Sequence, residues 1–259
     1  MSEDDSNLKY NKLAFCFLTY HDLIRYDIWN LFFKDIDNSK YNIYIHPKLY
    51  KNFKSNMKVK YHIVRNIVNT KSKTDISIVN ATIQLLNTAF NHDSQNNYFI
   101  FLTQSCIPLY NFETLYKIII QFPNSVLSYI EGNRAERYYQ LAASFKRYIP
   151  EKLFIKQQPN MILTRDDVDL FIKNNYTNYF RNMICPDEHY FINILLHIFK
   201  KKIIKRQVNF CNYDLQKTQA LEFEYINYEF INKIRNYGFL FMRKATNKSL
   251  IDINNLLNL

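Results

Sequence analysis

Residues 12–19, KLAFCFLT, are the stretch from which the fold of this chain follows. The run is almost entirely apolar and has the length of one strand, which is typical of a strand buried on both faces of a parallel sheet. Residues 22–33 then place their apolar side chains at helical spacing, and residues 42–46 (NIYIH) return to a strand pattern. Strand, helix and strand in this order form a βαβ unit, which predicts a parallel sheet with a right-handed crossover.

The next helix and strand repeat this order. Residues 75–90 carry their apolar side chains on one helical face, behind a cap at Thr74 and Asp75. Residues 98–102 (YFIFL) form a second apolar strand, which ends in the loop 103–109 (TQSCIPL). Because ligands of open α/β sheets bind at the carboxyl ends of the strands, this loop is predicted to border a ligand site.

The remaining elements alternate less regularly. We expect strands near 61–64, 125–130 and 161–163, helices at 112–121 and 165–174, and a helix that Pro186 opens and that runs to residue 199. The last third is aromatic and shows no repeat or linker that would mark a domain boundary. The prediction is a Rossmann-like α/β fold with a mostly parallel sheet flanked by helices. It forms a single domain over residues 12–259 with a C-terminal elaboration, after a disordered acidic tail at 1–11.

Composition narrows the function. The net charge of +11 favours a polyanionic partner, which includes nucleic acid, an acidic membrane surface and a nucleotide diphosphate. With Gly132 and Gly238 as the only glycines, the chain can build neither a GxGxxG turn nor a P-loop, which excludes Rossmann oxidoreductases, kinases and P-loop NTPases. The basic run at 200–206 is interpreted as a solvated helix end, with a phosphate-facing role as the alternative.

The cysteines and the apolar segments indicate where in the cell the protein is expected. The four cysteines form no CxxC pair, so neither a zinc site nor a disulfide framework is indicated, and reduced thiols fit the cytosol. The N-terminus lacks an apolar signal core, and no stretch approaches the roughly 20 apolar residues of a membrane span. We therefore expect a soluble cytoplasmic or otherwise intracellular protein.

Carboxylates suggest where chemistry could occur. In residues 185–191 (CPDEHYF), Asp187 and Glu188 would point about 100° apart on a helix, so only one of them can face a given cleft. The alternative is a helix start that carries acids to suit its dipole. The DxD patterns at 35–37 and 167–169 are formal candidates for a metal site, but neither places its carboxylates for joint coordination, so we expect solvated acids and no metal there.

Without a metal, Lys and Arg must stabilise the charge on a leaving diphosphate. Residues 238–245 (GFLFMRKA) place Arg243 and Lys244 directly after an apolar run, at the edge of the core. A snorkelling pair at the end of an element is the alternative. His21 and His46 follow the first two strands at one edge of the sheet, so they could flank a ligand, and ordinary hydrogen-bonded histidines are again the alternative.

Taken together, these motifs make the chain resemble the Core-2/I-branching β-1,6-N-acetylglucosaminyltransferase family, glycosyltransferase family 14. The resemblance runs from about residue 12 to residue 245. Its most specific pieces are 14–19 with 42–46, 75–90, 102–112 (LTQSCIPLYNF), 137–138, 161–165 (MILTR), 186–191 (PDEHYF) and 240–245 (LFMRKA).

The resemblance implies a GT-A type fold and sugar transfer with inversion and no metal cofactor. It assigns Glu188 as the catalytic base and Lys244 to the donor diphosphate, with Arg137 and, less directly, Glu131 at the acceptor. The family's second diphosphate-binding residue has no clear counterpart, and Arg243 or Lys217 could replace it. Pro47-Lys48 stands where animal members carry an acid after the second strand, which bears on nucleoside recognition.

We therefore expect an inverting, metal-independent glycosyltransferase that moves a sugar from a UDP-sugar to a glycan or other hydroxyl acceptor. The donor sugar that we expect first is N-acetylglucosamine. Glu188 would act as general base, His21 and His46 would lie near the nucleoside, and nucleic acid is not an expected partner. Two alternatives stay open. One is a basic nucleic-acid-binding protein, and the other is an inactive family member that only binds glycan.

Overall fold

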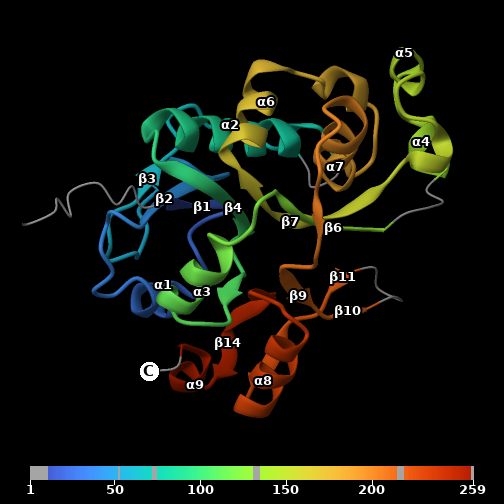
Figure 1. Ribbon diagram of the computed structural model, residues 1–259. Helices are drawn as coiled ribbons and strands as arrows, with labels where there is room; N and C mark the ends of the chain where they lie inside the picture. Colours follow the sequence, from blue (N-terminus) through green and yellow to red (C-terminus); the bar gives the residue numbers. More distant parts are fainter. Residues whose placement is uncertain (1–10, 52, 72–74, 131–134, 215–218, 258–259) are drawn as a thin grey trace, which may run out of the picture.

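A seven-stranded sheet in the order β3-β2-β1-β4-β7-β6-β8 forms the centre of the computed structural model (Figure 1). The structure describes residues 11–51, 53–71, 75–130, 135–214 and 219–257. The strands of the central sheet are β1 (Lys12–Thr19), β2 (Tyr41–Pro47), β3 (His62–Ile63), β4 (Asn96–Thr103), β6 (Val126–Ile130), β7 (Lys156–Thr164) and β8 (Ile204–Lys205).

The strand directions confirm the predicted α/β fold with a mostly parallel sheet. β1 pairs in parallel with both β2 and β4, β2 with β3, and β6 with β8, whereas β7 runs antiparallel to its neighbours β4 and β6. Both faces of β1 are buried: Phe15 and Phe17 belong to one core and Ala14 and Cys16 to the other. This explains why residues 12–19 read as an unbroken apolar run.

Helices cover both faces of the sheet (Figure 1). On the first face, α1 and α3 pack with Phe15 and Phe17, and on the second face α2, α6 and α7 pack with Ala14 and Cys16. None of the helices in the described ranges has the length and apolar character needed to cross a membrane. The helical elements between β1 and β8 are α1 (Tyr26–Phe32), α2 (Ser77–His92), α3 (Phe112–Ile119), α4 (Ala135–Tyr139), α5 (Ala143–Lys146), η1 (Glu151–Leu153), α6 (Arg165–Lys173), η2 (Thr177–Phe180), η3 (Pro186–Glu188), α7 (Tyr190–Asn193) and η4 (Ile194–Ile198).

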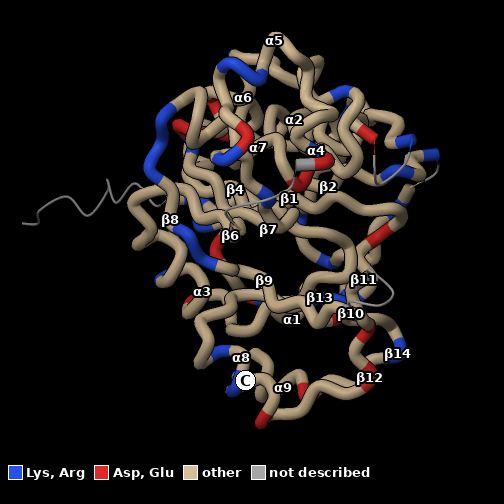
Figure 2. The backbone as a smooth tube through the Cα atoms, turned by 90° about the vertical axis from the view of Figure 1, so that its right-hand side faces the viewer, with Lys and Arg blue, Asp and Glu red and all other residues tan. Residues whose placement is uncertain are grey.

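The C-terminal part packs beneath the first core. Figure 2 shows α8, α9, β12 and β14 at the end of the molecule opposite α2, α4 and α7. In sheet order β5-β13-β9, three short strands join this part to the loop that follows β4. Its elements are β5 (Ile107–Pro108), β9 (Asn209–Cys211), β10 (Tyr213–Asp214), β11 (Gln219–Ala220), β12 (Phe223–Ile226), α8 (Tyr228–Asn236), β13 (Phe241–Arg243), β14 (Ala245–Ile251) and α9 (Ile253–Leu257).

The predicted continuous helix from Pro186 to residue 199 is wrong. The segment forms a 3₁₀ turn (η3), a short α-helix (α7) and a π-helical turn (η4) in succession. The break falls at His189, whose φ of −133° lies outside helical values. Its ring Nδ1 lies 2.8 Å from the carbonyl oxygen of Ile155 on β7, so a contact with a distant strand competes with the regular helix.

The predicted solvation of the second DxD pattern is wrong for Asp167, which is buried. Its carboxylate accepts a hydrogen bond from Ser125 Oγ at 2.5 Å and pairs with Lys201 Nζ at 3.3 Å. Lys201 belongs to the basic run at 200–206, and Arg206 of the same run donates to the carbonyl oxygen of Gly238 at 3.2 Å. This run is therefore partly engaged in structural contacts rather than being a fully solvated end. Asp35 is exposed, as expected.

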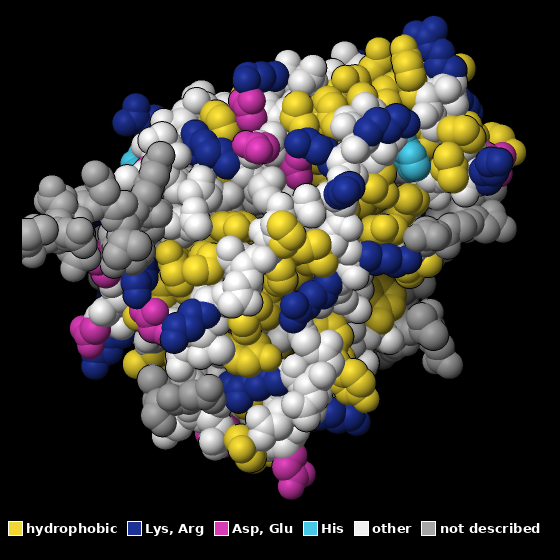
Figure 3. Space-filling model, in the orientation of Figure 1, with side chains coloured by type: hydrophobic (Ala, Val, Ile, Leu, Met, Phe, Trp, Pro, Cys, Tyr) yellow, Lys and Arg dark blue, Asp and Glu magenta, His cyan; other side chains and the backbone are white. Residues whose placement is uncertain are grey.

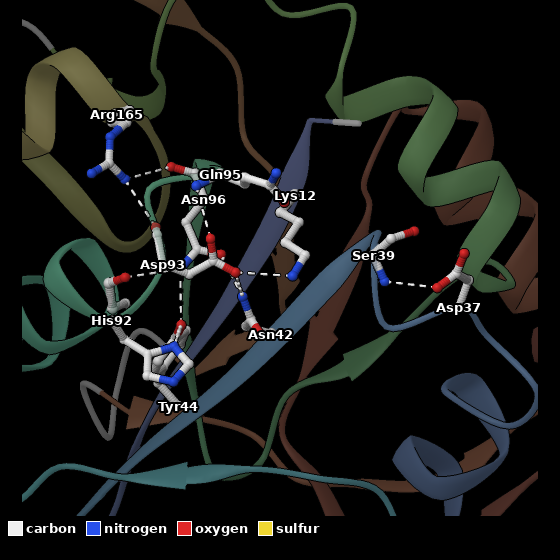
Figure 4. Close-up of polar contacts among 11 residues, drawn as sticks. Lys12, Asp37, Ser39, Asn42, Tyr44, His92, Asp93, Gln95, Asn96 and Arg165 are labelled. Carbon is white, nitrogen blue, oxygen red and sulfur yellow. Dashed lines mark hydrogen bonds and ion pairs between the residues drawn. The ribbon is translucent and has the colours of Figure 1, made fainter. Parts of the chain in front are cut away.

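A charged network holds the amino ends of the central strands (Figure 4). Asp93, which follows α2, binds Lys12 Nζ at 2.9 Å and Asn42 Nδ2 at 2.9 Å, and so links β1 and β2 to the turn before β4. Burial opposes the ionisation of Asp93, but the hydrogen bonds from Lys12, Gln95 and Asn42 outweigh it and lower its pKa to about 2. The network therefore stabilises the amino edge of the sheet, which is opposite the carboxyl edge where the ligand is predicted to bind.

Candidate functional site

A basic groove lies at the carboxyl ends of β1 and β4. It has a volume of about 310 Å³, which is in the range of small-molecule sites. Among the described residues that line it, those with charged side chains are basic, namely Lys48, Arg243 and Lys244. The uncharged lining residues are Leu18, Thr19, Tyr20, Thr70, Ile78, Thr103, Gln104 and Ser105. The groove thus occupies the sheet edge where parallel α/β folds bind ligands, and its charge suits an anion.

Pairing between β13 and β5 places the basic pair in this groove. Met242 lies opposite Ile107 in the antiparallel ladder, and Ala245 N donates to Ser105 O at 3.0 Å. The segments 102–112 and 240–245, far apart in sequence, are therefore joined by main-chain hydrogen bonds. This carries Arg243 and Lys244 to the end of β4, as the expected carboxyl-edge site requires.

Polar side chains fill the space beneath Arg243. Asn209 Nδ2 donates to Asn160 Oδ1 at 2.9 Å, and Asn160 Nδ2 lies 3.6 Å from Cys106 Sγ. Burial raises the pKa of the Cys106 thiol, while the nearby Arg243 guanidinium acts in the opposite direction. Arg243 Nε is buried and has no hydrogen-bond partner among the described residues. Arg243 therefore presents a desolvated donor at the floor of the groove.

The second cluster surrounds Glu188. Its Oε2 accepts from Arg137 Nη1 at 2.6 Å and pairs with Lys156 Nζ at 3.1 Å, and all three side chains are about a quarter exposed. Arg137 and Glu188, two of the residues predicted for the site, are thus in contact. Lys156 was not predicted, because it begins β7 in a stretch without a recognisable motif, and only the fold brings it next to Glu188.

Backbone contacts with β7 fix the position of this cluster. His189 Nδ1 donates to Ile155 O at 2.8 Å, which leaves Nε2 as an acceptor facing Arg137 Nη1 at 3.5 Å. Asn193 binds the same backbone, since its Oδ1 accepts a hydrogen bond from Ile155 N at 3.0 Å. Burial is the main reason that the pKa of His189 falls to about 4, so the ring stays neutral at physiological pH.

Asp187 and Glu188 have different environments, as expected of adjacent acids that cannot face one cleft. Burial first and the Glu188 charge second raise the pKa of Asp187 to about 7. Asp187 Oδ1 is buried without a hydrogen-bond partner in the described part of the chain. Glu188 instead faces Arg137 and Lys156. The geometry therefore favours Glu188 over Asp187 as the carboxylate that serves a ligand.

Helix α2 connects the two clusters. Ile78 in its first turn lines the groove, and η3, which carries Glu188, packs against α2 and β7. Glu188 itself is not among the residues that line the groove. The basic groove and the Glu188 cluster are therefore both in contact with α2.

The two predicted nucleoside residues lie in different surroundings. His21 is exposed and lines a second hollow of about 310 Å³ together with Asp22, Leu49, Lys51, Phe53 and Lys54. His46 is fully buried, and its Nε2 accepts from Val68 N at 3.0 Å. His46 therefore matches the hydrogen-bonded alternative, and the expectation that both histidines flank one ligand fails for it. Tyr20 and Lys48 of the groove directly precede His21 and Leu49, so the hollow adjoins the groove.

Several predicted residues lie beyond the reach of the structure. Glu131 and Lys217 fall outside the described residues, as do residues 1–10 of the expected tail, so the division into a tail and one domain stays a prediction. The described part of the chain contains no group of three or more His, Cys, Asp or Glu side chains arranged to hold a metal ion. Cys16, Cys106, Cys185 and Cys211 are free cysteines.

The basic groove thus lies where ligands of open α/β sheets bind. The chain belongs to the Core-2/I-branching enzyme family, whose model matches residues 13–235. This agrees with the resemblance seen in the sequence.

Two individual proteins illustrate the similarity. Glycosyltransferase BC10 of Oryza sativa subsp. japonica is 22% identical over an alignment of 242 residues, which covers 82% of this chain and 60% of the rice protein. The chain thus spans less than two thirds of that relative's length. Among solved structures, 4-diphosphocytidyl-2C-methyl-D-erythritol synthase from Anaerococcus prevotii matches with a TM-score of 0.32 and 11% identity, over 77% of this chain and 89% of that structure.

Proposed function

We propose that this protein transfers a sugar from a UDP-sugar to a hydroxyl acceptor with inversion and without a metal ion, using Glu188 as general base. N-acetylglucosamine is the sugar that the family resemblance favours. The observation that carries the proposal is the groove at the carboxyl edge, in which Lys48, Arg243 and Lys244 supply positive charge and none of the described lining residues is a carboxylate. A metal-dependent donor site commonly binds its cation through carboxylates, which the described lining does not supply.

In the proposed reaction, the acceptor oxygen attacks the anomeric carbon from the face opposite the diphosphate. The new carbon–oxygen bond forms as the bond to the β-phosphate oxygen breaks, and the bonding electrons leave with UDP. Glu188 takes the proton of the acceptor hydroxyl, while Lys244 and Arg243 stabilise the charge on the diphosphate. The nucleoside would occupy the hollow beside His21, which adjoins the groove.

The rival reading as a nucleic-acid-binding protein finds less support. Ring pairs such as Phe15 with Trp29 and Phe171 with Phe191 lie within the two cores, so these aromatic residues are not available to stack bases. Basic side chains are spread over the face seen in Figure 3 rather than gathered in one stripe. On this face the positive charge therefore does not outline a track for a nucleic-acid backbone.

The test uses protein treated with EDTA, a set of UDP-sugars and a panel of saccharide acceptors. We expect transfer without added metal, and loss of roughly 10²–10⁴-fold in turnover in Glu188→Gln, as for removal of a general base. UDP binding by calorimetry should persist in that variant, since Glu188 does not line the groove. Glu224→Gln, which changes an exposed carboxylate of β12, is the matched control.

Three results would contradict this function. Turnover that is unchanged in Glu188→Gln would remove the assigned base. A strict requirement for Mn²⁺ or Mg²⁺ would show that the groove cations do not suffice for the diphosphate. Failure of the untreated protein to bind UDP at all would overturn the donor site and with it the proposed reaction.

A further inference from the structure

The carboxylate proposed as the base is held by two cations rather than one. Arg137 Nη1 and Lys156 Nζ both approach the same oxygen, Glu188 Oε2, at 2.6 and 3.1 Å. The two contacts occupy this oxygen and hold the Glu188 side chain in place. A ligand anion that takes over one or both of the cations would leave this oxygen free to contact the acceptor hydroxyl.

Contacts with buried residues hold both cations in position. Arg137 has a second acceptor in His189 Nε2, and the ring of His189 stacks on Phe154 at 4.7 Å between centroids. Lys156 follows Ile155, whose backbone is bound by His189 and Asn193. The spacing of the two positive charges is therefore set by buried contacts, as expected of a binding site.

The charges around Glu188 do not balance. Two cations face one carboxylate, and Asp187 contributes little negative charge below neutral pH because burial raises its pKa to about 7. Residues 135–156 carry five basic and two acidic side chains. Figure 3 shows dark blue basic side chains beside yellow apolar ones over α4 and α5. An anion approaching this corner of the molecule would meet a positive potential.

We propose that the acceptor is an acidic saccharide, whose carboxylate or sulfate binds between Arg137 and Lys156 and releases Glu188 to take the proton of the reacting hydroxyl. The inference rests on the proposed function, since it names the class of acceptor for that reaction. A neutral acceptor leaves the ion pairs of Glu188 in place, so it should bind weakly and react slowly. The arginine fork suits a planar carboxylate, whereas lysine supplies a point charge.

The probes are methyl β-glucuronide and methyl β-glucoside, which differ at C6, with glucose 6-sulfate to separate carboxylate from sulfate recognition. Calorimetry measures their binding to the UDP-loaded protein. We expect the glucuronide or the sulfate to bind roughly tenfold or more tightly than the glucoside, as for a charge-assisted hydrogen bond. Binding should weaken as salt is raised.

Four variants locate the effect. Arg137→Gln and Lys156→Gln should each abolish the preference for the acidic probes, whereas Arg137→Lys should retain part of it because the charge remains. Lys152→Gln is the matched control, since Lys152 is an exposed lysine of η1, close to Lys156 in sequence. A preference that survives in both glutamine variants would overturn the proposal.

The outcomes also separate this inference from the function on which it rests. Intact UDP binding with no preference for either acidic probe, or with no binding of them, overturns the acidic acceptor and leaves sugar transfer standing. Loss of UDP binding in the unmodified protein overturns the transfer reaction itself. A sulfate preference without a glucuronide preference supports the proposal and assigns the anion as sulfate.

Discussion

Replacing Asp93 by asparagine should reveal how much stability the network at the amino edge of the sheet supplies. Hydrogen bonds from Lys12, Gln95 and Asn42 lower the pKa of Asp93 from 3.8 to about 2, against the opposing effect of burial. A shift of this size corresponds to about 2 kcal/mol of unfolding free energy at neutral pH. The side chain is 19% exposed, so screening by solvent is limited.

The pH dependence of the effect is its most specific feature. Because the folded state lowers the pKa of Asp93, the stabilisation is fully present above about pH 4 and is lost as the pH falls toward 2. Urea unfolding of the wild type and Asp93→Asn should therefore differ by about 2 kcal/mol at pH 7 and by much less near pH 2.5. In thermal melts at pH 7 the variant should unfold about 4–8 °C lower.

Asp35→Asn provides the control, because Asp35 is exposed and asparagine tolerates its positive φ of 58°. That variant should change the unfolding free energy by less than about 0.5 kcal/mol at either pH. A difference between wild type and Asp93→Asn that is equal at pH 7 and pH 2.5 would refute the reasoning. It would mean that the lost contacts matter through packing and not through the charge.

Three further predictions concern the two clusters and the frame that holds them. Lys244→Ala should weaken UDP binding in calorimetry roughly tenfold while leaving uridine binding nearly unchanged; equal losses would argue against a diphosphate contact. Asp187→Asn should remove a loss of stability that the wild type shows as pH rises from about 4 to 7, because the folded state retains a proton that the unfolded chain releases; parallel urea stability curves for both proteins would contradict this. Asp167→Ala should lower the unfolding free energy by about 2–4 kcal/mol in urea titrations, because it leaves Lys201 and the Ser125 hydroxyl without their buried partner. A change below about 0.5 kcal/mol would show that the buried pair is not needed.

The central strands could be predicted from the sequence because their burial leaves a local trace. Residues 12–19 and 98–102 are apolar on both faces, and the structure places them as adjacent parallel strands β1 and β4. The strand β7 was only partly anticipated, at 161–163, because its first half carries Gln157, Pro159 and the buried Asn160. Polar residues that satisfy each other across the core break the hydrophobic pattern on which such predictions rest.

The residues of the candidate site also differ in whether the sequence alone could reveal them. Glu188, Arg137, Arg243 and Lys244 lie in segments with motifs, and the structure pairs the first two and sets the last two along one groove. Lys156 lies in no motif, because only the contact of β7 with η3 brings it next to Glu188. The misjudged helix after Pro186 has the same origin, because a hydrogen bond between elements 34 residues apart decides the backbone at His189.

The distribution of positive charge separates the two halves of the proposed reaction. In the groove, the described lining contains cations and no carboxylate, so an incoming diphosphate would meet positive charge that none of these residues neutralises. Around Glu188, the cations are already paired, so a ligand gains less from binding them and must compete with an internal anion. Affinity for UDP should therefore reside in the groove, whereas the Glu188 cluster discriminates between acceptors by whether they can displace that internal anion.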